Sequence, residues 1–206
     1  GELDYLIPER VWLETEKALH TQSFDLYFKT LCDFNAINHI YPDLNGIDQV
    51  IANSSLTAYK NVSPELKLAS LFCAVDTVRD ENVVDHLDEI QNRIKFPNSY
   101  KSFAKSALRT TKILNESREN ISADDIYEII LATDAFRNPE DFMLIMEFHK
   151  LADDGDLKVK IRMIMDAFDS CKEIGYDKKS FEGLEGDAIK EKLDALRIEK
   201  INSTLK

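Results

Sequence analysis

The chain has 206 residues, of which 44% are hydrophobic, so it can fill the core of one domain or of two small ones. Its formal net charge of −12 argues against nonspecific binding to nucleic acid, which needs basic surface, and we expect no DNA partner. No apolar run approaches eighteen residues and the N-terminus resembles no secretory leader, so we expect no membrane partner.

Cysteine and histidine spacing gives no sign of a metal centre or of a disulfide framework. Cys32, Cys73 and Cys171 lie far apart among apolar residues and form no CxxC pair. The four histidines are scattered, without the spacing of two ligands to one metal: His20, His39, His86 and His149. We therefore expect buried free thiols in a reducing cytosol, structural or surface histidines, and a cytoplasmic protein.

Apolar residues at three- and four-residue spacing predict helices along most of the chain. The first runs from about Arg10 to His20, and Ser23 can cap a second. Residues 41–46 predict a loop. Ser63-Pro64-Glu65 has the cap, the proline and the acid that open a helix.

Helical signals continue to the end of the chain. One helix ends before Phe96-Pro97, Ser99 opens a long one, and Ser122 with Asp125 forms a capping box for the next. Later helices begin at Asn138-Pro139, after Asp153-Asp154-Gly155 and after Gly186. Strand alternation is not sustained and glycines are few, so we predict an all-α, multi-helix fold.

Two sequence motifs resemble those of a known protein family. Residues 8–19, Pro-Glu-Arg-Val-Trp-Leu-Glu-Thr-Glu-Lys-Ala-Leu, resemble the neck motif of bacterial tRNA nucleotidyltransferases (CCA-adding enzymes) and of their poly(A) polymerase relatives. Residues 134–139, Asp-Ala-Phe-Arg-Asn-Pro, resemble a phrase of the family's tail. Residues 28–44 and the helix after Gly186 resemble weaker phrases, and all four follow the family's order.

The resemblance implies the end of a neck at residues 1–22, a helical body at 23–117 and a helical tail at 118–206. The family's catalytic head would lie upstream, with a Gly-Gly/Ser-x-x-Arg loop and an Asp-x-Asp pair that holds two metal ions. Gly1 is the only glycine among residues 1–45, so this segment has no such loop. Asp154-Gly155-Asp156 has the Asp-x-Asp pattern but follows no glycine loop. We expect the parent enzyme to use CTP, ATP and Mg²⁺ in that head, and this chain alone to bind no cofactor and to be inactive.

The body resembles an HD phosphohydrolase domain without its ligands. Such a domain needs a His, a His-Asp pair and a further Asp around one divalent metal. In the helix that would carry the His-Asp pair, Cys73 and Ala74 stand at its two positions, and Arg79 stands where a further His often occurs. A shifted register places Val75-Asp76 at the pair, which still lacks the His. We interpret the region as a degenerate, HD-like structural remnant and expect no metal site.

Four basic residues form the leading candidate for a binding surface. Lys101, Lys105, Arg109 and Lys112 are four, four and three residues apart, which places them on one helix face with no acid between them. We call this set the basic stripe. It is about 16 Å long at the helical rise and suits the phosphates of RNA. The alternative is an ordinary solvated face.

The last helix and the neck supply weaker candidates. Lys190 and Arg197 can contact RNA phosphates, although interleaved acids favour surface ion pairs. In the neck, the resemblance gives Arg10 and Glu14 a bracing role, and an exposed ion pair one turn apart is the alternative. We expect Trp12 to pack in the core.

Two classes of function remain open. The first is the tRNA-binding C-terminal portion of a CCA-adding nucleotidyltransferase, which holds the tRNA elbow and acceptor stem by shape and phosphate contacts while an upstream head extends the 3′ end. Binding of tRNA would then be weak or head-dependent, and a poly(A) polymerase portion is the runner-up. The second class is a non-catalytic helical module that binds protein or forms a homodimer, which the acidic charge favours.

Overall fold

The computed structural model describes residues 6–44, 46–52, 55–79, 82–117, 120–151, 155–177 and 180–205. All regular structure in these ranges is helical, with eleven α-helices, two short 3₁₀ segments and no strand. This confirms the predicted all-α class. None of the helices in the described part is long and apolar enough to cross a membrane. The predicted turn at Asp153-Asp154 and the side chain of Arg79 lie outside the described residues.

The chain forms two compact units, Gly1–Thr111 and Lys112–Lys206. Their boundary lies inside one helix, α7 (Asn98–Glu116). The predicted division between body and tail, after residue 117, falls just beyond the end of the same helix. That division and the one at residue 22 stay predictions.

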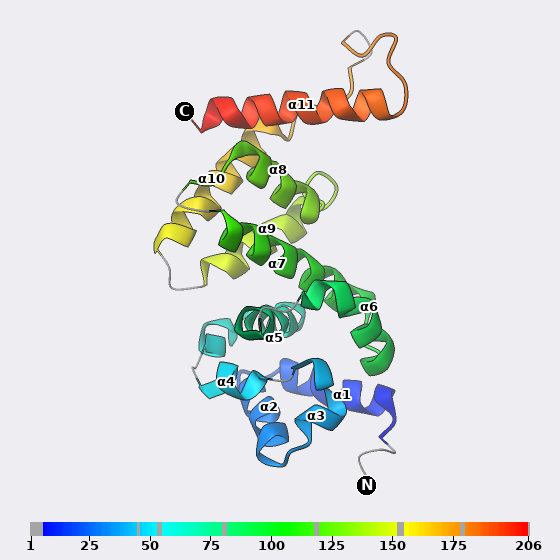
Figure 1. Ribbon diagram of the computed structural model, residues 1–206, viewed down its shortest axis with the longest axis vertical. Helices are drawn as coiled ribbons and strands as arrows, with labels where there is room; N and C mark the ends of the chain where they lie inside the picture. Colours follow the sequence, from blue (N-terminus) through cyan, green and yellow to red (C-terminus); the bar gives the residue numbers. More distant parts are fainter. Residues whose placement is uncertain are drawn as a thin grey trace. The chain divides into compact units, whose positions relative to one another are not determined.

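Unit 1 is built around α5 (Pro64–Arg79), in which every residue from 66 to 73 is buried. A helix that is buried on all sides belongs in the middle of a core. Helices α1 and α4 pack on α5 together with two 3₁₀ segments, η2 and η3, and Figure 1 shows α1 to α4 gathered on one side of it. The elements of the unit besides α5 and α7 are α1 (Pro8–Leu19), α2 (Phe24–Asp33), α3 (Ile37–Ile40), η2 (Pro42–Leu44), α4 (Ile47–Ala52), η3 (Ser55–Tyr59) and α6 (Val83–Ile94).

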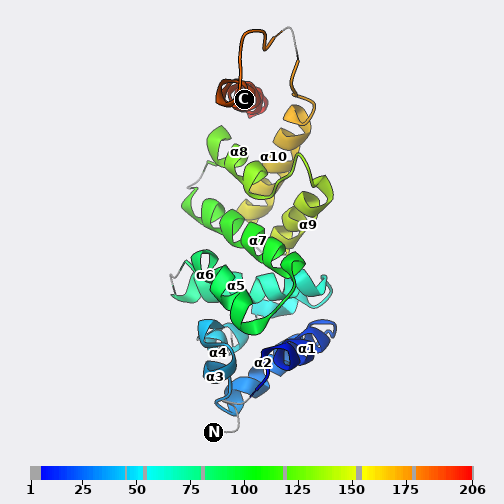
Figure 2. The same ribbon diagram turned by 90° about the vertical axis from the view of Figure 1, so that its right-hand side faces the viewer.

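Unit 2 contains α8 (Ala123–Ala132), α9 (Pro139–Lys150), α10 (Gly155–Cys171) and α11 (Asp187–Thr204). Helix α10 packs against the other three, and α11 also crosses α8, as Figures 1 and 2 both show. The core includes the rings of Phe142 and Phe168, whose centres are 4.7 Å apart. The apolar residues whose spacing predicted these helices form the faces that are buried in this core.

Local signals set several helix ends where the sequence predicted them. The hydroxyl of Ser122 accepts a hydrogen bond from the Asp125 N–H at 3.1 Å, and the Asp125 carboxylate accepts one from the Ser122 N–H at 3.0 Å, which completes the capping box. Lys95 ends α6 in the left-handed conformation, with φ of 66°, just before Phe96-Pro97. By contrast, the Ser23 side chain makes no capping hydrogen bond.

Residues 37–59 depart most from the expectation, because they hold the short elements α3, η2, α4 and η3. The loop predicted at 41–46 contains one of them, η2. Helices of one or two turns are too short to show a period and are stable only through packing. Their side chains Ile47, Val50 and Leu56 are buried, so tertiary contacts select these turns.

Candidate nucleic-acid interface

The basic stripe occupies the outer side of α7. Lys105, Arg109 and Lys112 are exposed, and Lys101 is half-buried. On the other side of the helix, Ala104, Ala107 and Leu108 are buried. The helix therefore has the amphipathic character that its spacing predicted, with cations on the solvent side.

Lys101 is held by an acid from a neighbouring helix. Its ammonium group donates to the Asp88 carboxylate of α6 at 2.9 Å. This hydrogen bond and charge hold the pKa of Asp88 below its usual value, and Lys105 adds to the effect. The charge of Lys101 is thus largely compensated. In the described part of the chain, neither Lys105 nor Arg109 forms a recorded ion pair, so these two carry the exposed positive charge of the stripe.

Arg197 of α11 is engaged within unit 2. Its Nε and Nη2 donate to the carbonyl oxygen of Ile174 at 3.1 and 3.0 Å, and its guanidinium carbon lies 3.6 Å from the centre of the Phe136 ring. Beside it, the Tyr127 hydroxyl donates to Asp194 at 2.6 Å. Burial, with the bond to Asp194, raises the pKa of Tyr127 to about 12, so the phenol stays a donor. An RNA contact by Arg197 stays a prediction and would use only its remaining donor atoms.

The other predicted residue of α11, Lys190, is exposed. Two residues further along, the Lys192 ammonium group donates to the carbonyl oxygen of Ser180 and lies 5.2 Å from the centre of the Phe181 ring. The two lysines therefore differ, although the sequence presents them alike. Of the candidates on this helix, Lys190 is the one whose side chain faces solvent.

The neck residues are arranged differently from the pairing considered for them. Glu14 accepts from Lys17 at 2.9 Å, and in the described part of the chain no ion pair joins it to Arg10. Trp12 is buried as expected, and its ring centre lies 4.8 Å from that of Tyr100. Residues 8–19 thus attach α1 to α7 through an aromatic contact, and the bracing role of Arg10 and Glu14 stays a prediction.

The positions compared with HD ligands have structural contacts. Cys73 is buried, its Sγ accepts from the Thr111 hydroxyl at 3.5 Å, and burial raises the pKa of its thiol to about 12. It therefore stays a neutral thiol, whereas a metal ligand is a thiolate. Asp76 accepts from the Val83 N–H at 2.8 Å and so caps α6. The described residues contain no group of three or more His, Cys, Asp or Glu that could hold a metal ion.

All three cysteines are free, and two are buried, whereas Cys32 is half-buried. His149 is the one histidine buried in the described part of the chain. These thiols and this imidazole are spread over both units, so they form no shared site.

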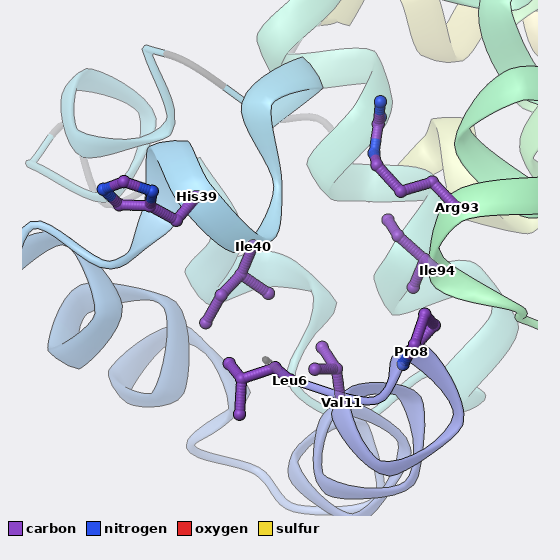
Figure 3. A pocket seen from close by; sticks show the side chains of 7 residues that line it. All are labelled: Leu6, Pro8, Val11, His39, Ile40, Arg93 and Ile94. Carbon is purple, nitrogen blue, oxygen red and sulfur yellow. The ribbon is translucent and has the colours of Figure 1, made fainter. Parts of the chain in front are cut away.

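Unit 1 also has a pocket of about 200 Å³ that the sequence did not indicate. It lies among the start of α1, α3 and the end of α6, and Figure 3 shows His39 and Arg93 on opposite sides of it. Five of the seven described lining residues are apolar, so the pocket suits an apolar group. The lining consists of Leu6, Pro8, Val11, His39, Ile40, Arg93 and Ile94. Because these residues come from three elements, no sequence motif could have revealed the pocket.

Among known proteins, this chain is similar to a CCA-adding enzyme and to multifunctional CCA proteins. A CCA-adding enzyme of Actinobacillus succinogenes is 28% identical over 167 residues, which cover 71% of this chain and 42% of that protein. A multifunctional CCA protein of Acinetobacter baumannii strain AYE is 49% identical over 47 residues, 23% of this chain and 11% of that protein. The protein of the same name from strain ATCC 17978 is 47% identical over a stretch of equal length.

The chain thus spans less than half the length of the relatives that it matches. No family model matches it, and no solved structure matches it either. The similarity to the first relative covers most of the chain, whereas the higher identities belong to a short segment.

Proposed function

Because this chain is related to the CCA-adding enzymes, we propose that it is the tRNA-binding portion of a nucleotidyltransferase that builds the 3′ end of tRNA. The observation that carries the proposal is the exposed positive charge of Lys105 and Arg109 on α7, in a chain whose net charge is −12. Nucleic-acid affinity depends on such local charge because each neutralised phosphate releases counterions.

In this proposal the chain binds and positions RNA, and the chemistry belongs to a head that carries the two-metal Asp-x-Asp site with Mg²⁺, CTP and ATP. The side chains of Lys105 and Arg109 contact backbone phosphates from one face of α7, and Lys112 lies one turn further along the same helix. Lys101 supports them through its bond to Asp88, which neutralises an acid close to the stripe. Recognition of this kind reads shape and backbone rather than sequence.

The test is a titration of the full chain against fluorescently labelled tRNA, followed by anisotropy at low and at physiological salt. We expect saturable binding that weakens with salt, and a dissociation constant at least about tenfold higher in the variant Lys105→Glu/Arg109→Glu. The matched control is Lys95→Glu/Lys200→Glu, which changes the net charge equally at two exposed positions outside the stripe. Equal losses in both variants would reject the proposal, and no binding at low salt would place the affinity in the head or favour a protein partner.

A portion of a poly(A) polymerase is the alternative within the family, because the neck and body are shared. Competition separates the two: unlabelled tRNA should displace the labelled tRNA at far lower concentration than an adenosine homopolymer does. Equal competition would favour the polymerase.

A protein-interaction module is the alternative outside the family. It is favoured by the apolar pocket of Figure 3 and by the exposed side chains of Ile7 and Leu13 on the neighbouring part of the chain. Sedimentation of the chain over a range of concentrations tests its simplest form, a homodimer. A concentration-dependent dimer that Ile7→Ser/Leu13→Ser abolishes would support this alternative.

A further inference from the structure

A second pocket lies in unit 2, between the end of α9 and the first three turns of α10. Its volume is about 340 Å³, which lies at the lower end of the roughly 300–1,000 Å³ typical of small-ligand sites. Its described lining consists of Lys150, Lys158, Arg162, Met165 and Asp166. Every lining residue belongs to unit 2, so the pocket is complete within that unit.

Positive charge dominates this lining. Three of its five residues are cations and one is an acid, whereas the whole chain has 38 acids against 26 lysines and arginines. Lys150 donates to Glu147 at 2.6 Å, and both side chains stay partly exposed. The lining thus combines three cationic groups with the carbon chains that carry them, and the charged groups suit an anion.

The order of residues along α10 points the same way. Lys158 and Arg162 are one helical turn apart, so both cations lie on the same face of α10. Asp166 follows one turn later. In the described part of the chain, Arg162 forms no ion pair with Asp166 or with any other acid. A bound anion would use the guanidinium donors of Arg162.

We propose that this pocket binds a phosphate group. The planar guanidinium of Arg162 presents paired N–H donors that match two phosphate oxygens, and the ammonium groups of Lys158 and Lys150 add charge from the flank. The phosphate can belong to an RNA backbone or be free in solution. The backbone source rests on the proposed function, since it makes unit 2 a second point of contact for the same RNA.

The first measurement uses the ¹⁵N-labelled full chain and inorganic phosphate. Amide shifts are followed during a phosphate titration at pH 7, with sodium chloride adjusted to keep the ionic strength constant. We expect saturable shifts confined to the end of α9 and the first three turns of α10. Arg162→Gln should raise the dissociation constant about tenfold or more, because it removes a charge-assisted hydrogen bond. Arg137→Gln, at an exposed position of the same unit, should leave it unchanged.

The second measurement repeats the tRNA titration with the same two variants. If the phosphate belongs to RNA, Arg162→Gln weakens tRNA binding and lowers the slope of log affinity against log salt by about 0.7–0.9, and Arg137→Gln does neither. If Arg162→Gln weakens phosphate binding alone, the site takes free phosphate. The phosphate titration stands even if the chain binds no tRNA, so the two proposals fail separately. Shifts that do not saturate, that chloride reproduces or that persist in Arg162→Gln would overturn the phosphate site.

Discussion

The guanidinium group of Arg197 lies over the ring of Phe136, with its central carbon 3.6 Å from the ring centre. The same group donates two hydrogen bonds to the carbonyl oxygen of Ile174. Arg197 therefore joins α11 to the segment after α8 and to the chain just beyond α10. A residue with these contacts contributes to stability whether or not it also touches RNA.

Replacing Arg197 by lysine should destabilise unit 2. Lysine keeps the charge but loses the planar group that stacks on Phe136 and the second donor to Ile174, so we expect the free energy of unfolding to fall by about 1–3 kcal/mol. Urea denaturation followed by circular dichroism measures this change. Lys190→Gln on the same helix is the control, and an equally large loss there would show that the contacts of Arg197 are unimportant.

Lys67 should be essential for the end of α1, although it lies in a buried stretch of α5. Its ammonium group donates to the carbonyl oxygens of Leu19 and Thr21 at 2.9 and 2.7 Å, where α1 ends, and burial lowers its pKa. Lys67→Met removes both donors and leaves two carbonyls without partners, so we expect a loss of about 1–3 kcal/mol. Thermal denaturation checks the loss. If Lys67→Met unfolds no more easily than the exposed-site variant Lys29→Met, the interpretation is wrong.

Stability should fall in mild acid because of His149. Burial lowers its pKa from about 6.5 to about 3, and its Nε2 has no hydrogen-bond partner among the residues that the structure describes. Below about pH 6.5, His149 therefore binds a proton in the unfolded chain but stays neutral in the folded chain. The contribution of neutral His149 to the free energy of unfolding is fully present above that pH. It declines by about 1.4 kcal/mol for each pH unit as the pH falls from 6.5 towards 3.

The test compares the unfolding free energy at pH 7.5 and at pH 5 in the original chain and in His149→Leu. We expect the original chain to lose about 2 kcal/mol more between these pH values than the variant does, because leucine binds no proton. His20→Gln, at an exposed histidine, serves as the control and should behave as the original chain. A pH dependence that His149→Leu leaves intact would assign the effect to other groups.

The positions of the helices could be predicted from local sequence signals, as several helix ends show. The Ser122–Asp125 capping box, Pro64 after Ser63 and the stop before Phe96-Pro97 all stand where the sequence predicted them. The apolar spacing also placed Trp12 and the small residues of α7 in the core. The pockets of both units escaped prediction, because their linings combine side chains from elements that are separate in the sequence.

The sequence by itself determined the all-α class and most helix ends, since caps, prolines and apolar periods act within a few residues of one another. Only the tertiary structure decided what each cation does. The stripe presents its four cations as equivalent, yet Lys101 pairs with Asp88 from another helix, whereas Lys105 and Arg109 are exposed. A long charged side chain takes its partner from whichever element packs beside it, and that neighbour is set by the folding of the whole unit rather than by spacing along one helix.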